Sequence, residues 1–210
     1  MEIDLYADVV CPWCYIGKRR LEQALESFDG KVTVRLRPFQ LDPSPVPEPV
    51  PMMEALGAKF GGPQRARQMV DHVTGVVAAT GLDYRYDRAV AANTFEAHRL
   101  VWFAEQRGFG SPMMDALQRA HFVDGADIGS RSALAGLAAG VGLDETEVRE
   151  WLDSDAGTSE VRAELAEAHA LGVTSVPTYV LAGKYAVVGA QETETLIQAL
   201  AEVARLEASA

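Results

Sequence analysis

The chain has 210 residues, and 19 Lys and Arg stand against 30 Asp and Glu, which gives a formal net charge of −11. A surface of this sign repels nucleic acids and anionic membranes, so we expect neither as a partner. No apolar stretch approaches the roughly 20 residues of a membrane-spanning helix. A chain of this size can also bury a sufficient core without disulfide bonds to stabilise it.

The first predicted elements are a strand at about 2–9 and a helix at about 12–28, and the two cysteines of the chain lie at their junction. In Cys11-Pro12-Trp13-Cys14, proline takes the first helical position, which it favours. The sulfur of Cys11 then lies at the helix N-terminus, where unpaired N–H groups and the helix dipole stabilise a thiolate. Cys14 lies one turn further along, close enough to form an exchangeable disulfide. The pattern indicates redox chemistry.

A zinc site and a structural thiol pair are two other interpretations of the cysteines. A zinc site needs four ligands, and the chain has no second cysteine pair. Its histidines, at 72, 98, 121 and 169, lack the spacing of a zinc finger. We therefore expect no metal, and no cofactor either. A buried pair of purely structural thiols stays open as an alternative.

The middle of the chain is predicted to be a strand at 32–37, a proline-rich segment and then helices. Proline recurs at 43, 45, 47, 49 and 51, so this segment should be extended, either as a linker or as the rim of an active-site cleft. Apolar residues at helical spacing predict helices at 64–80, 94–107, 112–122, 131–139, 145–152 and 158–171. Ser111, Ser130 and Asp144 are the expected N-caps.

Near the C-terminus, a proline stands at the head of a predicted strand. Val176-Pro177 precedes the run 178–181, which a turn at 182–184 joins to a second strand at 185–188, before a last helix at 192–207. Proline removes a ladder hydrogen bond, so a cis Val176–Pro177 bond in a tight turn is one arrangement that tolerates it. An ordinary trans turn is the other.

The order of these features resembles the DsbA-like branch of the thioredoxin superfamily. Cys11-Pro12-Trp13-Cys14 and the sequence that follows it to Lys18, Asn93-Thr94 with Ala97-His98, and Gly189-Ala190-Gln191 are similar to the FrnE-like dithiol–disulfide oxidoreductases. The resemblance implies an α/β, thioredoxin-like fold with a large all-helical insertion. Residues 1–42 and 172–210 would form the thioredoxin-like domain, and 43–171 the proline-rich connector and the helical insertion domain.

The resemblance also implies a function and a site. We expect a thiol–disulfide oxidoreductase or isomerase in which Cys11 is the nucleophile and Cys14 the resolving thiol. Substrate contacts are expected from Pro12, Trp13, Val176, Pro177 and His98. In this superfamily the cis-proline loop faces the cysteine pair, and its backbone pairs with an extended substrate. His98 is the most ambiguous, because a single helical histidine is more often a core or surface residue.

The expected partners are proteins with thiols or disulfides, with glutathione as a further partner. The alternative function is a glutathione-dependent isomerase or transferase, similar to hydroxychromene-carboxylate isomerase or the kappa-class transferases. Those relatives typically carry Ser in place of Cys11 and lack the second cysteine. No secretory signal is visible at the N-terminus, so we expect a cytoplasmic protein, as a monomer or homodimer.

Overall fold

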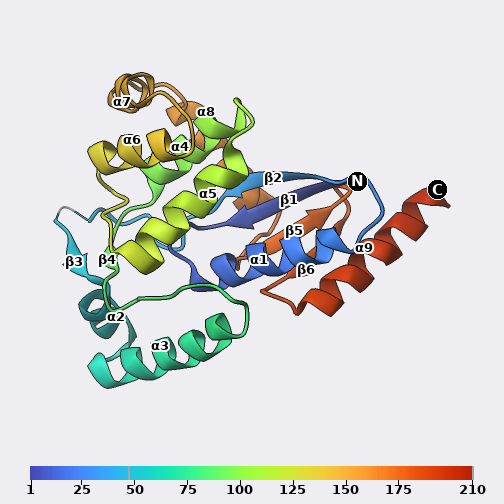
Figure 1. Cartoon of the computed structure of the whole chain (residues 1–210), viewed down its shortest axis with the longest axis horizontal. Coiled ribbons are helices and arrows are strands. Elements are labelled where there is room, and N and C mark those ends of the chain that lie inside the picture. The colour runs from blue at the N-terminus through green and yellow to red at the C-terminus, as the bar shows by residue number, and fades with distance from the viewer. Residues whose placement is uncertain (47, 210) are drawn as a thin grey trace.

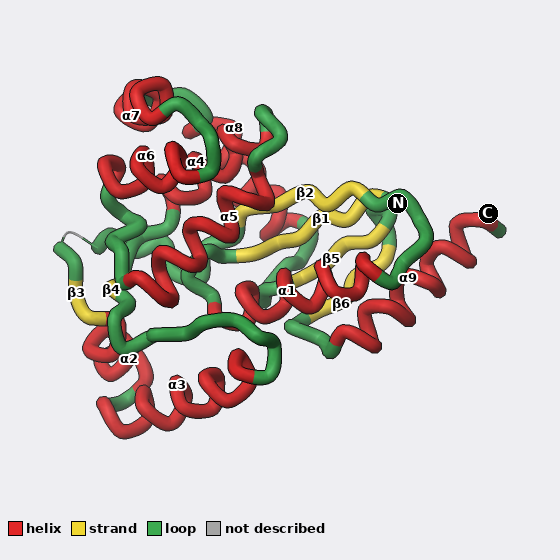
Figure 2. The backbone as a smooth tube through the Cα atoms, viewed as in Figure 1, coloured by secondary structure: helices red, strands yellow, loops and turns green. Residues whose placement is uncertain are grey.

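The computed structural model describes residues 1–46 and 48–209. Its main sheet joins the two ends of the chain, as Figures 1 and 2 show. The strands are β1 (Glu2–Ala7), β2 (Thr33–Pro38), β5 (Thr178–Leu181) and β6 (Tyr185–Val188), in the order β2-β1-β5-β6. Strand β1 pairs in parallel with β2 and antiparallel with β5, so the strand that precedes the cysteines lies inside the sheet.

Two helices lie side by side across the sheet in Figure 1, α1 (Pro12–Glu26) and α9 (Thr193–Ala208). Helix α9 buries Leu196, Leu200 and Val203, which recur at helical spacing on one face. Residues of β1 alternate between the two faces of the sheet, as in any strand. On the face that carries Asp4, the sheet is joined to helix α8 (Thr158–Ala170) through an ion pair between Arg37 and Glu164.

Helices make up most of the segment between β2 and β5. They are α2 (Met52–Phe60), α3 (Pro63–Ala78), α4 (Phe95–Glu105), α5 (Gly110–Arg119), the π-helix η1 (Ala120–Asp124), α6 (Arg131–Gly140), α7 (Glu145–Asp153) and α8. The two-residue strands β3 (Val50–Pro51) and β4 (Val90–Ala91) pair with each other. Within the described residues, no helix combines the length and the apolar character that a bilayer crossing needs.

The structure also corrects parts of the sequence interpretation. Helix α2 was not predicted, because it begins directly after the prolines. Ser111 is not an N-cap, since α5 already begins at Gly110 and Met113 N–H donates to the carbonyl of Phe109. Ser130 and Asp144 do cap their helices. In the proline-rich segment, Pro47 lies outside the described residues.

One buried apolar cluster crosses the expected domain boundary. It contains Ile3 and Leu5 of β1 together with Leu100, Phe103 and Leu117 of the helical segment. The two predicted domains, one made of 1–42 and 172–210 and the other of 43–171, thus share this core. Their division stays a prediction.

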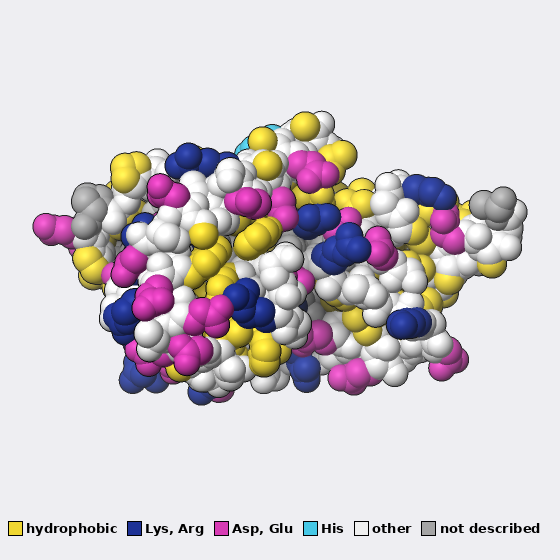
Figure 3. All heavy atoms as spheres, turned by 90° about the horizontal axis from the view of Figure 1, so that it is seen from above, with side chains coloured by type: hydrophobic (Ala, Val, Ile, Leu, Met, Phe, Trp, Pro, Cys, Tyr) yellow, Lys and Arg dark blue, Asp and Glu magenta, His cyan; other side chains and the backbone are white. Residues whose placement is uncertain are grey.

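The surface combines both signs of charge. On the face in Figure 3, Lys and Arg side chains lie among Asp and Glu side chains. Across the described surface, many charged side chains form local ion pairs, such as Arg149 with Glu145 at 2.7 Å and Arg205 with Glu202 at 2.7 Å. Exposed pairs of this kind contribute little to stability.

A buried histidine lies in an aromatic cluster at the π-helix. The His121 ring is 4.7 Å from that of Phe122 and 6.3 Å from that of Tyr86, measured between centroids. Neither of its nitrogens has a hydrogen-bond partner among the described residues, and the side chain is fully buried. Burial lowers the pKa of His121 to about 4, because the imidazolium cannot be solvated there.

This burial predicts a specific loss of stability in acid. The unfolded chain binds a proton at His121 near its ordinary pKa of about 6.5, and the folded chain near 4, so stability falls as the pH falls between these values. At pH 5 the loss that His121 causes should be about 2 kcal/mol. Urea unfolding at pH 7 and at pH 5 measures how much unfolding free energy the protein loses between the two pH values. This loss should be smaller by about 2 kcal/mol in His121→Leu than in the wild type. The exposed His72, changed to Gln, is the control and should leave the loss unaltered. Equal losses in wild type and His121→Leu would refute the buried neutral imidazole.

Candidate active site

The cysteine motif begins helix α1. Cys11 is the N-cap, with an extended backbone (φ −86°, ψ 114°), and Pro12 occupies the first turn. The backbone N–H groups of Cys14 and Tyr15 donate to the carbonyl of Cys11 at 3.0 and 3.1 Å. Proline does not destabilise the helix at this position, because the first helical N–H has no intrahelical acceptor in any case. The local sequence thus places the Cys11 sulfur at the positive end of the helix dipole.

Both cysteines are free thiols and both are buried, Cys11 with 3% and Cys14 with 0% of its surface exposed. A hydrogen bond from the Cys14 thiol lowers the pKa of Cys11, and the backbone N–H groups of Cys14 and Trp13 add to this effect against the opposing effect of burial. Burial raises the pKa of Cys14 well above its ordinary value, and so does its hydrogen bond to Cys11. The two thiols are therefore differentiated, with Cys11 as the one that ionises first.

A buried carboxylate lies behind the cysteines. Asp8 is 1% exposed and accepts hydrogen bonds from the backbone N–H of Leu41 at 2.8 Å and from Nε2 of His98 at 3.1 Å. The same nitrogen lies 3.0 Å from the carbonyl of Phe39, so it carries a proton. Through its charge, Asp8 raises the pKa of Cys11 and of Cys14. Sequence reasoning missed Asp8, although an acidic residue in a short apolar run before the motif was the available signal.

The loop before β5 lies against the sulfur of Cys11. The Val176–Pro177 peptide bond is cis, and Cys11 Sγ is 3.8 Å from the carbonyl oxygen of Val176. The loop is held by Thr178, whose hydroxyl donates to the carbonyl of Ser175 at 2.7 Å, and by Gly189 N–H, which donates to the carbonyl of Pro177 at 2.8 Å.

Gly17 lets helix α1 come close to this loop. A Cβ atom at position 17 would lie 2.7 Å from Cγ of Pro177 and would overlap the hydroxyl of Tyr179. Real Cβ atoms do not approach other atoms so closely. The sequence Cys14-Tyr15-Ile16-Gly17 therefore determines the packing of the loop as well as the position of the thiols.

A large cavity of about 890 Å³ opens beside Cys11. Its lining includes Cys11, Pro12, Trp13 and Val176, together with residues of α2, α3 and the segment 41–46. In Figure 1, the first turn of α1 faces α2 and α3 across this region. Four of the expected site residues thus meet at one cavity.

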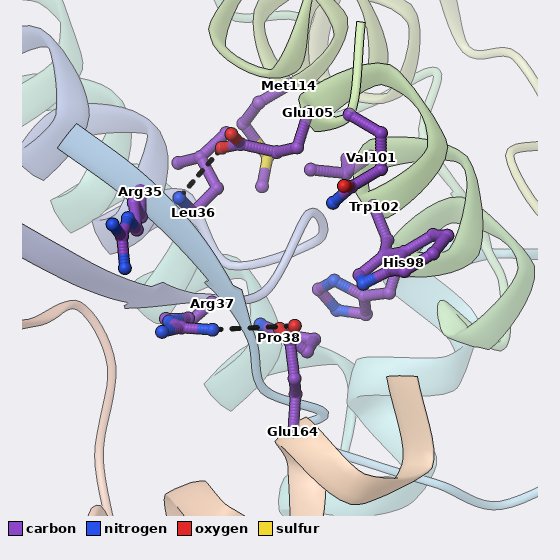
Figure 4. A pocket seen from close by; sticks show the side chains of 11 residues that line it. Arg35, Leu36, Arg37, Pro38, His98, Val101, Trp102, Glu105, Met114 and Glu164 are labelled. Atoms are coloured by element: carbon purple, nitrogen blue, oxygen red, sulfur yellow. Dashed lines mark hydrogen bonds and ion pairs between the residues drawn. The ribbon is translucent and has the colours of Figure 1, made fainter. Parts of the chain in front are cut away.

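His98 is placed elsewhere. It is not among the described residues that line the large cavity, and instead it borders a smaller one of about 260 Å³ (Figure 4). Two interactions are marked between the residues in Figure 4. Arg37 lies 3.4 Å from Glu164, and Glu105 accepts the backbone N–H of Leu36 at 2.9 Å. His98 thus reaches the thiols through Asp8, which itself lines the cavity beside Cys11.

In residues 1–46 and 48–209, no group of three or more His, Cys, Asp or Glu side chains is arranged to hold a metal ion.

A family model described as a DSBA-like thioredoxin domain matches residues 2–201. The chain belongs to this family.

Solved structures support the assignment and confirm the thioredoxin-like DSBA fold. A probable DsbA oxidoreductase from Streptomyces coelicolor is 39% identical, with a TM-score of 0.90 over 96% of this chain and 89% of that chain. The cytosolic disulfide reductase DsbM from Pseudomonas aeruginosa, solved with GSH, is 26% identical, with a TM-score of 0.66 over 100% of this chain and 98% of the other. A 2-hydroxychromene-2-carboxylate isomerase is 18% identical, with a TM-score of 0.73 over 100% and 98% of the two chains, and shows the fold alone.

The DSBA-like family groups this chain with thiol–disulfide oxidoreductases. The FrnE-like subtype is consistent with these matches but is not singled out by them.

Cys11 should be the more reactive thiol. In the reduced protein, iodoacetamide should modify Cys11 first, with an apparent pKa below the usual value of about 8.5, because the Cys14 thiol and the helix N-terminus stabilise its thiolate. Replacing Cys14 by Ala should raise this pKa relative to replacing it by Ser, since Ser keeps a donor. Mass spectrometry of the peptides identifies the modified residue, and the urea-unfolded chain is the control. Faster modification of Cys14 would contradict the assignment.

Adding one methyl group at Gly17 should destabilise the DSBA-like domain. Gly17→Ala should lose about 1–3 kcal/mol of unfolding free energy, because the Cβ atom displaces Pro177. Gly75, in the last turn of α3, is the control, since a Cβ atom there meets no atom within 4 Å. Gly75→Ala should gain about 0.5–1 kcal/mol from its helix propensity. Equal effects of the two substitutions in a denaturant titration would argue against the close contact.

Proposed function

We propose that this protein is a thiol–disulfide oxidoreductase in which Cys11 attacks the substrate disulfide and Cys14 resolves the intermediate. The observation that carries the proposal is the difference between the two thiols. The pKa of Cys11 is lowered and that of Cys14 is raised, and Cys11 is the one that lines the cavity.

The reaction needs no group beyond these thiols and a substrate disulfide. The Cys11 thiolate attacks one sulfur of the disulfide, which forms a mixed disulfide and releases one substrate thiolate. Cys14 then loses its proton and attacks the Cys11 sulfur, which releases the second thiolate and leaves a Cys11–Cys14 disulfide. Two electrons pass from the protein to the substrate, and the reverse sequence oxidises a substrate dithiol.

The neighbouring residues fit distinct roles in these steps. Pro12 and Trp13 form the part of the cavity wall next to the nucleophile. Val176 offers a backbone carbonyl beside the Cys11 sulfur, where an extended substrate segment can pair, and Pro177 orients that carbonyl. Asp8 is the candidate to accept the proton of Cys14, since its charge acts on both thiols. His98 positions Asp8 by its hydrogen bond and is not a direct substrate contact in this proposal.

The partners expected from the sequence are proteins with thiols or disulfides, and glutathione. The match to DsbM, a disulfide reductase solved with GSH and 26% identical to this chain, supports a glutathione-linked reaction. The same relative, described as cytosolic, supports the expected cytoplasmic location. Monomer or homodimer remains a prediction.

A glutathione-dependent isomerase or transferase is the second candidate. The large cavity beside Cys11 favours it, because such a cavity accommodates a small substrate. The second cysteine counts against it, since an isomerisation that uses a bound thiol needs no resolving partner.

Variants of the two cysteines distinguish these functions. Cys14→Ser should accumulate mixed disulfides with substrates, because attack occurs without resolution, and Cys11→Ser should accumulate none. Non-reducing gels and mass spectrometry after incubation with disulfide substrates measure both. If Cys14→Ser keeps its turnover of a small substrate in the presence of glutathione, the isomerase is favoured. Equal trapping by the two variants would overturn the assignment of roles.

A further inference from the structure

We infer that the cavity beside Cys11 selects an uncharged, apolar disulfide of low molecular weight, in preference to glutathione disulfide or to a disulfide of a folded protein. The inference rests on the proposed thiol–disulfide chemistry, and it replaces the protein and glutathione partners expected from the sequence with another substrate class. It depends on the lining of the cavity, on its charges and on the access to the Cys11 sulfur.

The lining is predominantly apolar. The side chains that form it include Val10, Met52, Leu56, Phe60, Met69 and Val73, which come from three separate segments of the chain. The volume of about 890 Å³ lies in the range of roughly 300–1,000 Å³ that is typical of small-molecule sites. An apolar occupant gains free energy here because its surface leaves water.

Aromatic rings form part of the wall. The rings of Tyr84 and Tyr86 stack at 5.4 Å with an angle of 7° between their planes, and Phe122 lies 5.6 Å from the first ring and 6.0 Å from the second. Burial raises the pKa of both tyrosines, so their hydroxyl groups remain neutral. A stacked, neutral wall suits an aromatic or aliphatic group that carries no charge.

The charges in the lining do not suit glutathione disulfide, in which the carboxylates outnumber the ammonium groups. Asp8 is buried and negative, and it already accepts two hydrogen bonds. Asp42 and Lys59 form an ion pair at 2.6 Å, and Lys59 is the one cation among the described lining residues. Carboxylates therefore outnumber cations in the lining, which opposes the binding of a molecule whose net charge is negative.

Access to the sulfur excludes a large rigid partner. Cys11 is 3% exposed and Cys14 is fully buried, and Cys11 is the cysteine that faces the cavity. Exchange requires the attacking sulfur to contact a sulfur of the substrate. A folded protein would have to insert its disulfide into the cavity between α1, α2 and α3, whereas a small disulfide can enter whole.

One reduced protein molecule supplies the electrons for one substrate molecule. The Cys11–Cys14 dithiol becomes a disulfide, and the apolar disulfide becomes two thiols, so a single turnover needs no other reductant. The test is a rapid-mixing measurement of this turnover, in which acid quenching and thiol titration follow the loss of protein thiols.

Four disulfide substrates that differ in charge, polarity and size are compared: bis(2-phenylethyl) disulfide, 2-hydroxyethyl disulfide, glutathione disulfide and insulin. Each rate is divided by the rate of the same disulfide with dithiothreitol, which removes differences in intrinsic reactivity. The normalised rate of bis(2-phenylethyl) disulfide should exceed the others by about tenfold or more, because it is the small disulfide of the set with large uncharged apolar groups that the lining can bury. An equal or higher rate with glutathione disulfide or insulin would overturn the inference.

A matched pair of variants on α3 tests where the selectivity arises. Met69 lines the cavity and is 39% exposed, and Gln68 is exposed beside it but does not line the cavity. Met69→Lys should abolish the preference for the apolar disulfide and raise the rate with glutathione disulfide. Gln68→Lys adds the same charge and should change neither. Identical behaviour of the two variants would refute binding in this cavity.

A binding measurement separates this inference from the proposed function. Bis(2-phenylethyl) sulfide has the same apolar groups but no disulfide, and tryptophan fluorescence should report its binding to wild type and not to Met69→Lys. If 2-hydroxyethyl disulfide and the other disulfides all fail to react while the sulfide binds, the redox function is wrong and the apolar site stands. If the disulfides react and the sulfide does not bind, the redox function stands and the apolar site is wrong.

Discussion

The burial of two sulfur atoms at the start of helix α1 is the constraint on which the rest of the structure depends. A thiolate without water is unfavourable unless hydrogen-bond donors surround it. At Cys11 these donors are the Cys14 thiol and the backbone N–H groups of Trp13 and Cys14 in the first turn of the helix. Asp8 opposes the ionisation of Cys11. Hydrogen bonds from the Leu41 N–H and from Nε2 of His98 hold the Asp8 carboxylate in place. Reactivity thus depends on a balance between fixed groups within a few residues of one another.

The site is also a junction between distant parts of the chain. The sulfur of Cys11 meets the carbonyl of Val176, 165 positions later, because β1 and β5 are neighbours in the sheet. Gly17 lets the helix reach the same loop. The helical segment then closes the other side of the sulfur through α2 and α3. One end of the chain therefore provides the nucleophile, the other end provides the backbone beside it, and the middle provides the cavity.

The parts of this arrangement that depend on local sequence could be predicted. The helix N-terminus at Cys11 follows from a proline in the first turn, and Ser130 and Asp144 cap their helices as expected. The parts that depend on contacts between distant residues could not. Asp8 and His98 are 90 positions apart, and no pattern along the chain relates them.

Helix α2 escaped prediction for a different reason. It begins immediately after Pro51, which ends strand β3, and β3 pairs with β4. Pro51 is also the N-cap of α2 and makes no side-chain hydrogen bond there. The sequence therefore has no capping signal at this point, and the preceding prolines favour an extended chain. The sequence allowed the proline-rich segment as the rim of a cleft, and Ser44 and Val46 do line the cavity, but the wall that α2 adds could not be predicted.

The order of strands in the sheet has a consequence for the synthesis of the protein. Strand β1 and both cysteines are made first, but β5, its neighbour on one side, is made after about 170 further residues have been added. During that interval the loop that covers the Cys11 sulfur does not exist, and the interior edge of β1 has no partner. The growing chain therefore presents both thiols to the redox buffer of its surroundings before the fold can protect or differentiate them. The oxidation state of the newly made protein is set by its environment first, and by its own structure only after the last strands have been added.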